Sequence, residues 1–151
     1  WADTAYRNKV IMLTDFKDKE VLDMGSGTAV LAILAKKLGA ARTVAIDNDE
    51  WAYRNAFTNC ELNGVKDVEI VLGDATAIQG TFDVVLANIN RNILLRDMHC
   101  YVEAMKPQGR IFFSGFYTED LASIKAEAER LGLRYELHLV KNNWVAAEFV
   151  K

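Results

Sequence analysis

The stretch from Glu20 to Leu38, EVLDMGSGTAVLAILAKKL, restricts the fold of this chain more than any other stretch. It predicts a short apolar strand, a tight turn at Gly25-Ser26-Gly27-Thr28, and an apolar helix from Thr28 to Leu38. The two glycines allow a close backbone approach that a side chain would prevent. The helix that follows directs free N–H groups and the positive end of its dipole above the turn. The pattern indicates a cradle for a small polar ligand, although two glycines also occur in ordinary strand-to-helix connections.

Strands and helices alternate along the rest of the chain. Strands are predicted at Glu20–Met24, Thr43–Ile46, Val68–Leu72, Phe82–Ala87, Arg110–Ser114, Arg134–Leu139 and Trp144–Val150. A short connection joins the last two strands, so they must be antiparallel. We therefore expect one α/β domain over residues 1–151, with a doubly wound, mostly parallel seven-stranded sheet and an antiparallel last strand.

Three of the predicted helices have boundaries that can be read from capping and breaking residues. Asn48 or Asp49 begins a helix that ends near Leu62, and Pro107-Gln108-Gly109 breaks the helix before the fifth strand. Thr118 begins the helix that ends near Leu131. A further helix is expected over residues 4–16.

The composition excludes several classes of protein. The 151 residues are 51% hydrophobic and carry a net charge of −3, which does not favour a nucleic-acid partner. The longest apolar run, Ala29 to Ala35, is too short to cross a membrane. Cys60 and Cys100 have no metal-ligand spacing, so no metal site is predicted, and isolated cysteines fit a reducing, cytoplasmic setting.

Polar residues end the first four predicted strands. Asp23 lies beside the glycine turn, Asp47 and Asp74 follow the second and third strands, and Asn88 ends the fourth. Ligands of open α/β sheets bind at the carboxyl ends of the strands, so we expect these side chains to share one site. Each of them is also a common helix cap or turn former.

The spacing of these residues favours a nucleoside ligand. Asp47 follows the glycine turn at about the 20-residue spacing typical of ribose-binding carboxylates. Asp74 is placed to accept from an adenine amino group, and Ile78 or Ala75 to cover the ring. The dinucleotide fingerprint requires Gly or Ala at the position of Val30, which we expect on the buried stripe of the helix. An NAD- or nucleotide-binding oxidoreductase is therefore the weaker alternative. S-adenosylmethionine fits better, with Asp23 near its ammonium group.

Several segments resemble a known family. VLDMGSGTA resembles motif I of class I S-adenosylmethionine-dependent methyltransferases, AIDND resembles their motif II, and GDA and FDVVLANI resemble the next two motifs. More narrowly, ANIN…IL followed by SGFY is similar to the lysine methyltransferases of large-subunit ribosomal protein eleven, and the likeness covers about Lys19 to the C-terminus.

The resemblance implies an enzyme that transfers a methyl group from S-adenosylmethionine, leaving S-adenosylhomocysteine, to lysine or terminal amines of a ribosomal protein. It implies no direct nucleic-acid partner and no membrane partner. The cofactor-binding residues that it implies are Asp23, Gly25, Ser26, Gly27, Asp47, Asn48, Asp74, Ala75 and Asn88.

The catalytic residues expected are Asn88 and Ile89. A lysine amine, with an ordinary pKa of about 10.4, must enter neutral, and hydrogen-bond acceptors can then orient its lone pair. The side-chain oxygen of Asn88 and the backbone carbonyl of Ile89 are suitable acceptors. No aromatic residue follows Asn88 in the manner of enzymes that methylate bases or glutamine amides, so an aliphatic amine is the better fit.

Two departures from the family pattern favour a third interpretation, a fragment that binds cofactor without turnover. Ala29 stands where the third glycine of motif I is usual, and residues 3–9 replace a glycine- and histidine-containing segment. The family's N-terminal substrate-recognition domain is also expected to be absent from this chain.

Overall fold

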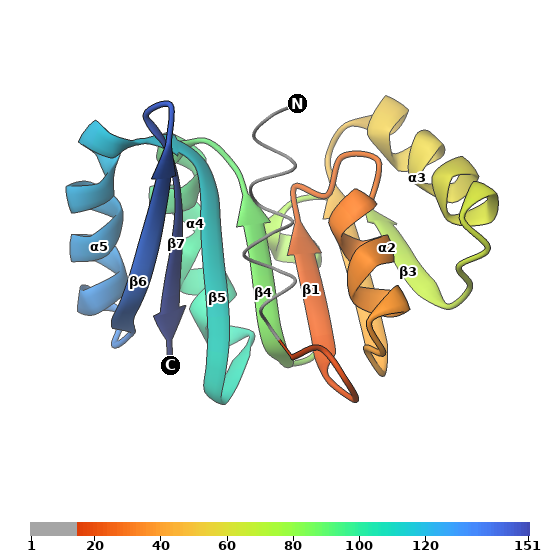
Figure 1. Ribbon diagram of the computed structural model, residues 1–151, viewed down its shortest axis with the longest axis horizontal. Helices are drawn as coiled ribbons and strands as arrows, with labels where there is room; N and C mark the ends of the chain where they lie inside the picture. Colours follow the sequence, from red (N-terminus) through yellow and green to blue (C-terminus); the bar gives the residue numbers. More distant parts are fainter. Residues whose placement is uncertain (1–14) are drawn as a thin grey trace.

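The computed structural model describes residues 15–151, which form a seven-stranded sheet with helices on both faces (Figure 1). The helix expected over residues 4–16 falls almost wholly outside this part of the chain. The elements, in chain order, are β1 (Glu20–Met24), α2 (Val30–Lys37), β2 (Arg42–Asp47), α3 (Glu50–Leu62), β3 (Val68–Leu72), η1 (Ala75–Ala77), β4 (Phe82–Asn88), α4 (Arg91–Glu103), β5 (Met105–Tyr117), η2 (Thr118–Asp120), α5 (Leu121–Arg130), β6 (Arg134–Lys141) and β7 (Trp144–Val150).

The strands lie in the order β3-β2-β1-β4-β5-β7-β6. All pairs from β3 to β5 are parallel, whereas β7 runs antiparallel to both of its neighbours. The predicted fold class is therefore confirmed, including the reversed last strand. The chain proceeds outward from β1 to β3 and then returns to β4 on the other side of β1. This reversal makes the carboxyl ends of β1 and β4 the switch point at which such sheets bind ligands.

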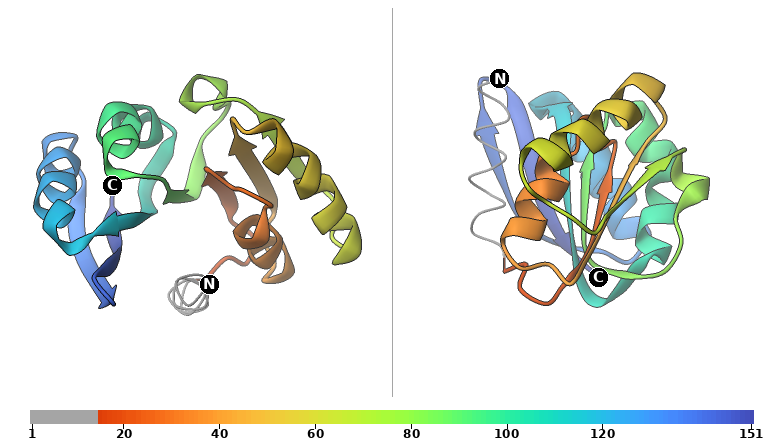
Figure 2. Two further views of the ribbon diagram at one scale, coloured as in Figure 1. Left: turned by 90° about the horizontal axis from the view of Figure 1, so that it is seen from above. Right: turned by 90° about the vertical axis from the view of Figure 1, so that its right-hand side faces the viewer.

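Helices cover both faces of the sheet (Figure 2). Each face buries its own apolar core. Leu22 and Met24 of β1 belong to the larger core, which α4 and α5 cover. Val21 belongs to the opposite core, under α2. This division follows from the strand geometry, because successive side chains point to opposite faces.

The start of α2 differs from the sequence expectation. The helix begins at Val30 rather than Thr28, because Ala29 adopts a left-handed conformation with φ of 66°. Ala29 is fully buried against alanines of α2, β2 and α3, whereas the Val30 side chain is 41% exposed. The prediction that Val30 lies on the buried stripe of the helix was therefore wrong.

The fifth strand is longer than predicted. Pro107 lies inside β5, where a register shift between Phe82 and Val84 of the neighbouring β4 accommodates the irregular segment. None of the helices formed by the described residues has both the length and the apolar content needed to cross a membrane.

Candidate functional site

A pocket of about 270 Å³ opens at the carboxyl ends of the central strands. From the sequence-predicted residues it brings together Gly25, Asp47, Asn48, Asp74, Ala75, Asn88 and Ile89. The left panel of Figure 2 looks down on this edge of the sheet. Asp23, Ser26 and Gly27 are close in sequence but are not among the residues that line the pocket.

Gly25 brings the glycine turn against the end of β4. Its φ is +67°, and its N–H donates to the carbonyl oxygen of Ile46 at 2.9 Å. A Cβ atom at this position would lie 2.8 Å from Cγ1 of Ile89 and 3.1 Å from the carbonyl oxygen of Asn88. The first distance is shorter than real Cβ contacts and the second is tight, so a side chain here would force Ile89 to move. The positive φ also favours glycine.

Asp47 joins the turn to the end of β2. Its Oδ2 accepts from the Gly27 N–H at 2.8 Å, and its Oδ1 accepts from the Asp49 N–H at 2.9 Å. Each carboxylate oxygen retains a further acceptor position, as a ribose would need. Gly27 therefore takes part indirectly, by orienting Asp47. Asp49, rather than Asn48, caps α3, accepting from the Trp51 N–H.

Asp74 and Ala75 form the side of the pocket that follows β3. The Oδ1 atom of Asp74 accepts from the hydroxyl and the N–H of Thr76, at 2.5 and 2.9 Å. These hydrogen bonds, the hydroxyl first, lower the pKa of Asp74, so its carboxyl is ionised at neutral pH. Because both use Oδ1, acceptor capacity remains on Oδ2 for an amino group.

Asn88 and Ile89 are held by Ser114 and Gly115 of β5, which were not predicted to belong to the site. Ser114 Oγ donates to Asn88 Oδ1 at 3.3 Å, and the Ile89 N–H donates to the Ser114 carbonyl at 3.1 Å. A Cβ on Gly115 would lie 2.8 Å from Asn88 Oδ1. The SGFY sequence could have predicted the contribution of Ser114 and Gly115 to the site, because it ends the strand next to β4.

The first turns of α4 form the remaining wall, and these residues were missed. Asn90 caps the helix by accepting from the Ile93 N–H at 3.1 Å. Ile93, Arg96, Asp97 and Tyr101 then line the pocket. Their spacing of three and four residues is the helical repeat, so it places them on one face of α4. That spacing, counted from Asn90, could have predicted from the sequence that these residues share one face.

Asp23 has a different place from the other strand-end residues. It is 1% exposed, and it alternates with Leu22 and Met24, whose side chains lie in the core that α4 and α5 cover. The Asp23 side chain therefore lies on the face of the sheet that α2 covers.

The pocket is acidic. Asp47, Asp74 and Asp97 line it, and Arg96 is the one basic residue among the described residues that do so. Arg96 contacts both carboxylate oxygens of Asp97 at 2.9 Å, which neutralises that aspartate. Asp47 and Asp74 then remain as two negative charges facing the pocket. They favour a cationic ligand and disfavour a diphosphate. The described residues hold no group of three or more His, Cys, Asp or Glu side chains placed to bind a metal.

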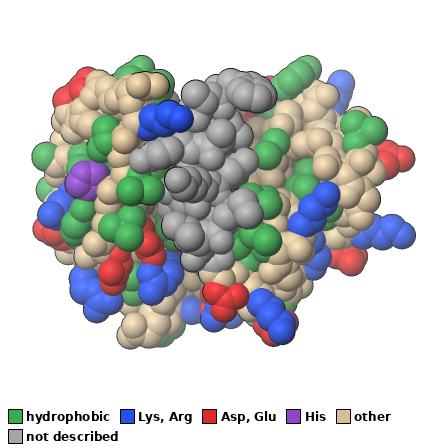
Figure 3. All heavy atoms as spheres, viewed as in Figure 1, with side chains coloured by type: hydrophobic (Ala, Val, Ile, Leu, Met, Phe, Trp, Pro, Cys, Tyr) green, Lys and Arg blue, Asp and Glu red, His purple; other side chains and the backbone are tan. Residues whose placement is uncertain are grey.

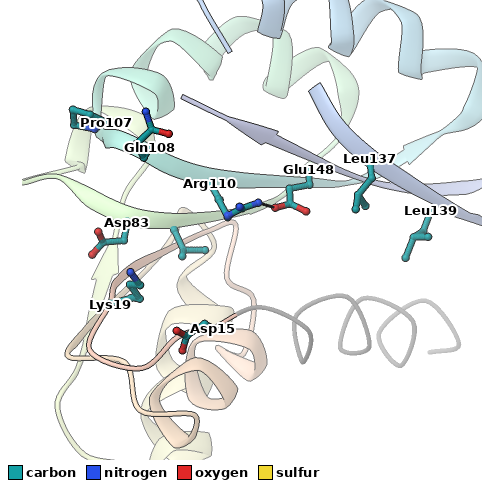
Figure 4. Close-up of a pocket in the computed structure, with 10 residues that line it drawn as sticks. Asp15, Lys19, Asp83, Pro107, Gln108, Arg110, Leu137, Leu139 and Glu148 are labelled. Atoms are coloured by element: carbon teal, nitrogen blue, oxygen red, sulfur yellow. Dashed lines mark hydrogen bonds and ion pairs between the residues drawn. The ribbon is translucent and has the colours of Figure 1, made fainter. Parts of the chain in front are cut away.

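A larger hollow, of about 710 Å³, lies at the opposite ends of the strands (Figure 4). Arg110 of β5 and Glu148 of β7 point toward each other there and form an ion pair. Figure 3 shows acidic and basic side chains intermixed along this lower rim of the molecule. Asp83 is also paired, with Lys106. Because these charges are paired and the hollow lies away from the switch point, we do not assign it to the cofactor.

Comparison with known proteins identifies the family. The sequence profile of the ribosomal protein L11 methyltransferase (PrmA) family matches residues 9–151. The chain belongs to this family. It is 52% identical over 139 residues to a ribosomal protein L11 methyltransferase of Bacteroides fragilis, covering 91% of this chain and 50% of that protein. The corresponding protein of Myxococcus xanthus is 42% identical over 125 residues, covering 83% of this chain and 43% of that protein.

Solved structures agree with this family assignment. A ribosomal protein L11 methylase from Lactobacillus delbrueckii subsp. bulgaricus superimposes with a TM-score of 0.92 at 27% identity, covering 98% of this chain and 78% of that chain. A methyltransferase from Pyrococcus furiosus, with a TM-score of 0.84 at 21% identity, covers 97% of this chain and 81% of that chain, and shares the fold. The chain spans about half the length of the curated relatives that it matches.

Proposed function

We propose that this chain transfers a methyl group from S-adenosylmethionine to an amine, on a lysine side chain or a chain terminus, of ribosomal protein L11. The observation that carries the proposal is that Asp47, Asp74 and Asn88, from three different strand ends, line one pocket together with Gly25. Membership of the ribosomal protein L11 methyltransferase family supports the choice of reaction and of substrate.

The chemistry of the pocket fits this cofactor. S-adenosylmethionine supplies a methyl group on a positively charged sulfonium, and the uncompensated charges of Asp47 and Asp74 suit a cation. Asp47 would hold the ribose hydroxyls, and Asp74 with Ala75 would hold the adenine. Gly25, Ser26, Gly27 and Asn48 would shape the turn around the amino-acid part. Asp23 would act from the opposite face of the sheet, by stabilising the strand end beneath the turn.

Asn88 and Ile89 are the residues that we assign to the acceptor amine. Their oxygens can accept hydrogen bonds from a neutral amine and aim its lone pair, which raises the rate by orientation rather than by proton removal. Ser114 and Gly115 support this role, because they fix the Asn88 carboxamide and leave room beside it. A neighbouring positive charge lowers the pKa of the amine and so favours its neutral form.

A dinucleotide-dependent oxidoreductase is not favoured. The reason is the charge of the pocket, and not the presence of Val30 in place of Gly or Ala. The pocket presents the carboxylates of Asp47 and Asp74, which would repel a diphosphate. The volume of about 270 Å³ lies just below the range of about 300–1,000 Å³ for ligand pockets, which suits one nucleoside better than two.

We place the reaction in the cytoplasm, with no membrane or nucleic-acid partner. The free cysteines Cys60 and Cys100 support a reducing compartment, and the net charge of −3 gives no support for a polyanionic partner.

The test is calorimetric titration with S-adenosylhomocysteine and with NAD, followed by transfer of a radiolabelled methyl group to ribosomal protein L11. We expect binding of S-adenosylhomocysteine at one site, no binding of NAD, and label on the ribosomal protein. Binding without label would support the interpretation of a cofactor-binding fragment. Binding of NAD alone would contradict the proposal.

A further inference from the structure

Tyr101, on α4, combines full burial with contact to the pocket. Its side chain is 0% exposed and is among the largest fully buried side chains, yet it lines the pocket at the carboxyl ends of the strands. Within residues 15–151 its hydroxyl has no hydrogen-bond partner. A buried hydroxyl without a partner destabilises a protein, and native proteins rarely leave one in that state.

The residues around Tyr101 in the pocket wall are charged. Tyr101 lines the pocket together with Asp74, Arg96 and Asp97, and α4 packs against η1, the short helix that Asp74 caps. Burial, reinforced by the charge of Asp97, raises the pKa of Tyr101 well above its ordinary value of 10. The phenol therefore keeps its proton at any physiological pH and is available as a donor.

We propose that Tyr101 is a positioning residue for the nucleobase of the cofactor, donating a hydrogen bond to a purine ring nitrogen, directly or through one ordered water. The inference rests on the proposed function, because it takes an adenine nucleoside as the ligand. Asp74 accepts from the amino group of the base, so Asp74 and Tyr101 together present an acceptor and a donor. A polar site of this size can also hold a bridging water at little cost in affinity.

The location distinguishes this role from one at the acceptor amine. The helix that carries Tyr101, α4, packs against η1, which Asp74 caps, on the adenine side of the pocket. Asn88, Ser114 and Gly115 form a separate cluster at the ends of β4 and β5. We therefore expect Tyr101 to affect binding of the nucleoside part and not the orientation of the amine.

The experiment is the Tyr101→Phe variant, titrated calorimetrically with S-adenosylhomocysteine and with adenosine alone. We expect both affinities to fall by the same factor, about fivefold to tenfold, which is the effect of one hydrogen bond. The melting temperature of the unliganded protein should not fall, because the substitution removes only a hydroxyl that has no partner there.

Thr43→Val is the matched control. Thr43, on β2, is also fully buried and its hydroxyl also has no hydrogen-bond partner among the described residues, but Thr43 does not line the pocket. This substitution should leave both affinities unchanged. An effect on affinity equal to that of Tyr101→Phe would contradict the inference.

The remaining outcomes separate this inference from the proposed function. If the unaltered protein fails to bind S-adenosylhomocysteine, the proposed function is wrong and the inference falls with it. If the unaltered protein binds and Tyr101→Phe binds both ligands equally well, the inference alone is wrong. A lower melting temperature with unchanged affinities would show a purely structural role and would also overturn it.

Discussion

The two ends of the parallel strands carry polar side chains of different kinds. At the amino ends, charged groups are paired with one another: Lys106 contacts Glu20 at 2.8 Å and Asp83 at 3.3 Å, and Arg110 contacts Glu148. At the carboxyl ends, Asp47 and Asp74 accept hydrogen bonds from backbone and hydroxyl groups and retain their negative charge.

The pairing of charges distinguishes the two ends of the sheet better than the volumes of their hollows do. The hollow at the amino ends is about 710 Å³ and the pocket at the carboxyl ends about 270 Å³, yet the smaller one brings together Asp47 and Asp74, neither of which forms an ion pair among the described residues, and the Gly25 turn. Charges that are paired with each other need no ligand for their stabilisation, whereas carboxylates with a free acceptor position can accept hydrogen bonds from a ligand. The comparison predicts that substitutions at the carboxyl ends change binding or turnover, and that substitutions at the amino ends change stability.

The largest expected effect is that of Asn88→Ala on turnover. Loss of the oxygen that orients the amine should reduce single-turnover methyl transfer about a hundredfold, while the affinity for S-adenosylhomocysteine changes by less than about threefold. Ser114→Ala is the milder companion variant, since it removes only the hydrogen bond that fixes Asn88 Oδ1. Equal turnover in Asn88→Ala and the unaltered protein would exclude Asn88 from the reaction.

Gly25→Ala should weaken binding of S-adenosylhomocysteine about tenfold to a hundredfold, because its Cβ would displace Ile89. Gly64→Ala, just past the end of α3, is the control for backbone strain alone. Gly25 and Gly64 both have positive φ, 67° and 65°, but a Cβ on Gly64 meets nothing within 4 Å, and Gly64 does not line the pocket. We expect Gly64→Ala to lower the melting temperature with less than about threefold loss of affinity. Similar losses in both variants would show that contact with Ile89 is unimportant.

Asp47→Ala should weaken cofactor binding by about 1–2 kcal/mol, as expected when ligand hydroxyls lose an acceptor. Asp83→Ala makes the same substitution at the amino end, where Asp83 accepts from the Glu20 N–H at 2.9 Å. The comparison predicts lower stability and unchanged affinity for Asp83→Ala. Calorimetry and thermal melting of both variants measure this, and reduced affinity in Asp83→Ala alone would reverse the assignment of the two ends.

The smallest effect concerns pH. The hydrogen bond from Lys106 lowers the pKa of Glu20 below its ordinary 4.5, and an opposing effect of burial is outweighed. A carboxyl whose pKa is lower in the folded protein than in the unfolded chain stabilises the fold at any pH above its unfolded pKa. This contribution is lost as the pH falls through its folded pKa. Lys106→Gln should therefore lower the melting temperature by about 1–2 °C at pH 7. The difference should shrink as the pH falls below 4.5 and through the lowered pKa values of Glu20 and Asp83, both of which Lys106 contacts. A difference as large at pH 2 as at pH 7 would show another cause.

Sequence patterns predicted the parts of the site that depend on topology. Asp47, Asp74 and Asn88 each end a parallel strand, so alternation of strands and helices was enough to bring them to one edge. Ser114 was not placed, because its contact with Asn88 depends on the register of β4 against β5. Tyr101 and Arg96 were missed because their approach to the pocket depends on the rotation of α4 about its axis.

The errors in the fold came from local backbone conformation. Val30 was expected to be buried by helical periodicity counted from Thr28, but the left-handed Ala29 delays the helix and leaves Val30 exposed. Pro107-Gln108-Gly109 was read as a break before the strand, and the register shift instead carries it inside β5. Neither feature changes the hydrophobic pattern from which the elements were predicted.

The most direct test of which end of the sheet binds the cofactor is nuclear magnetic resonance of the nitrogen-15-labelled protein, titrated with S-adenosylhomocysteine. The account predicts that the amide signals of Gly25, Gly27, Ala75 and Ile89 shift with a single saturating dependence on ligand. The signals of Glu20, Gly109 and Arg110, at the opposite end, should stay in place. Shifts confined to Glu20, Gly109 and Arg110 would contradict the account.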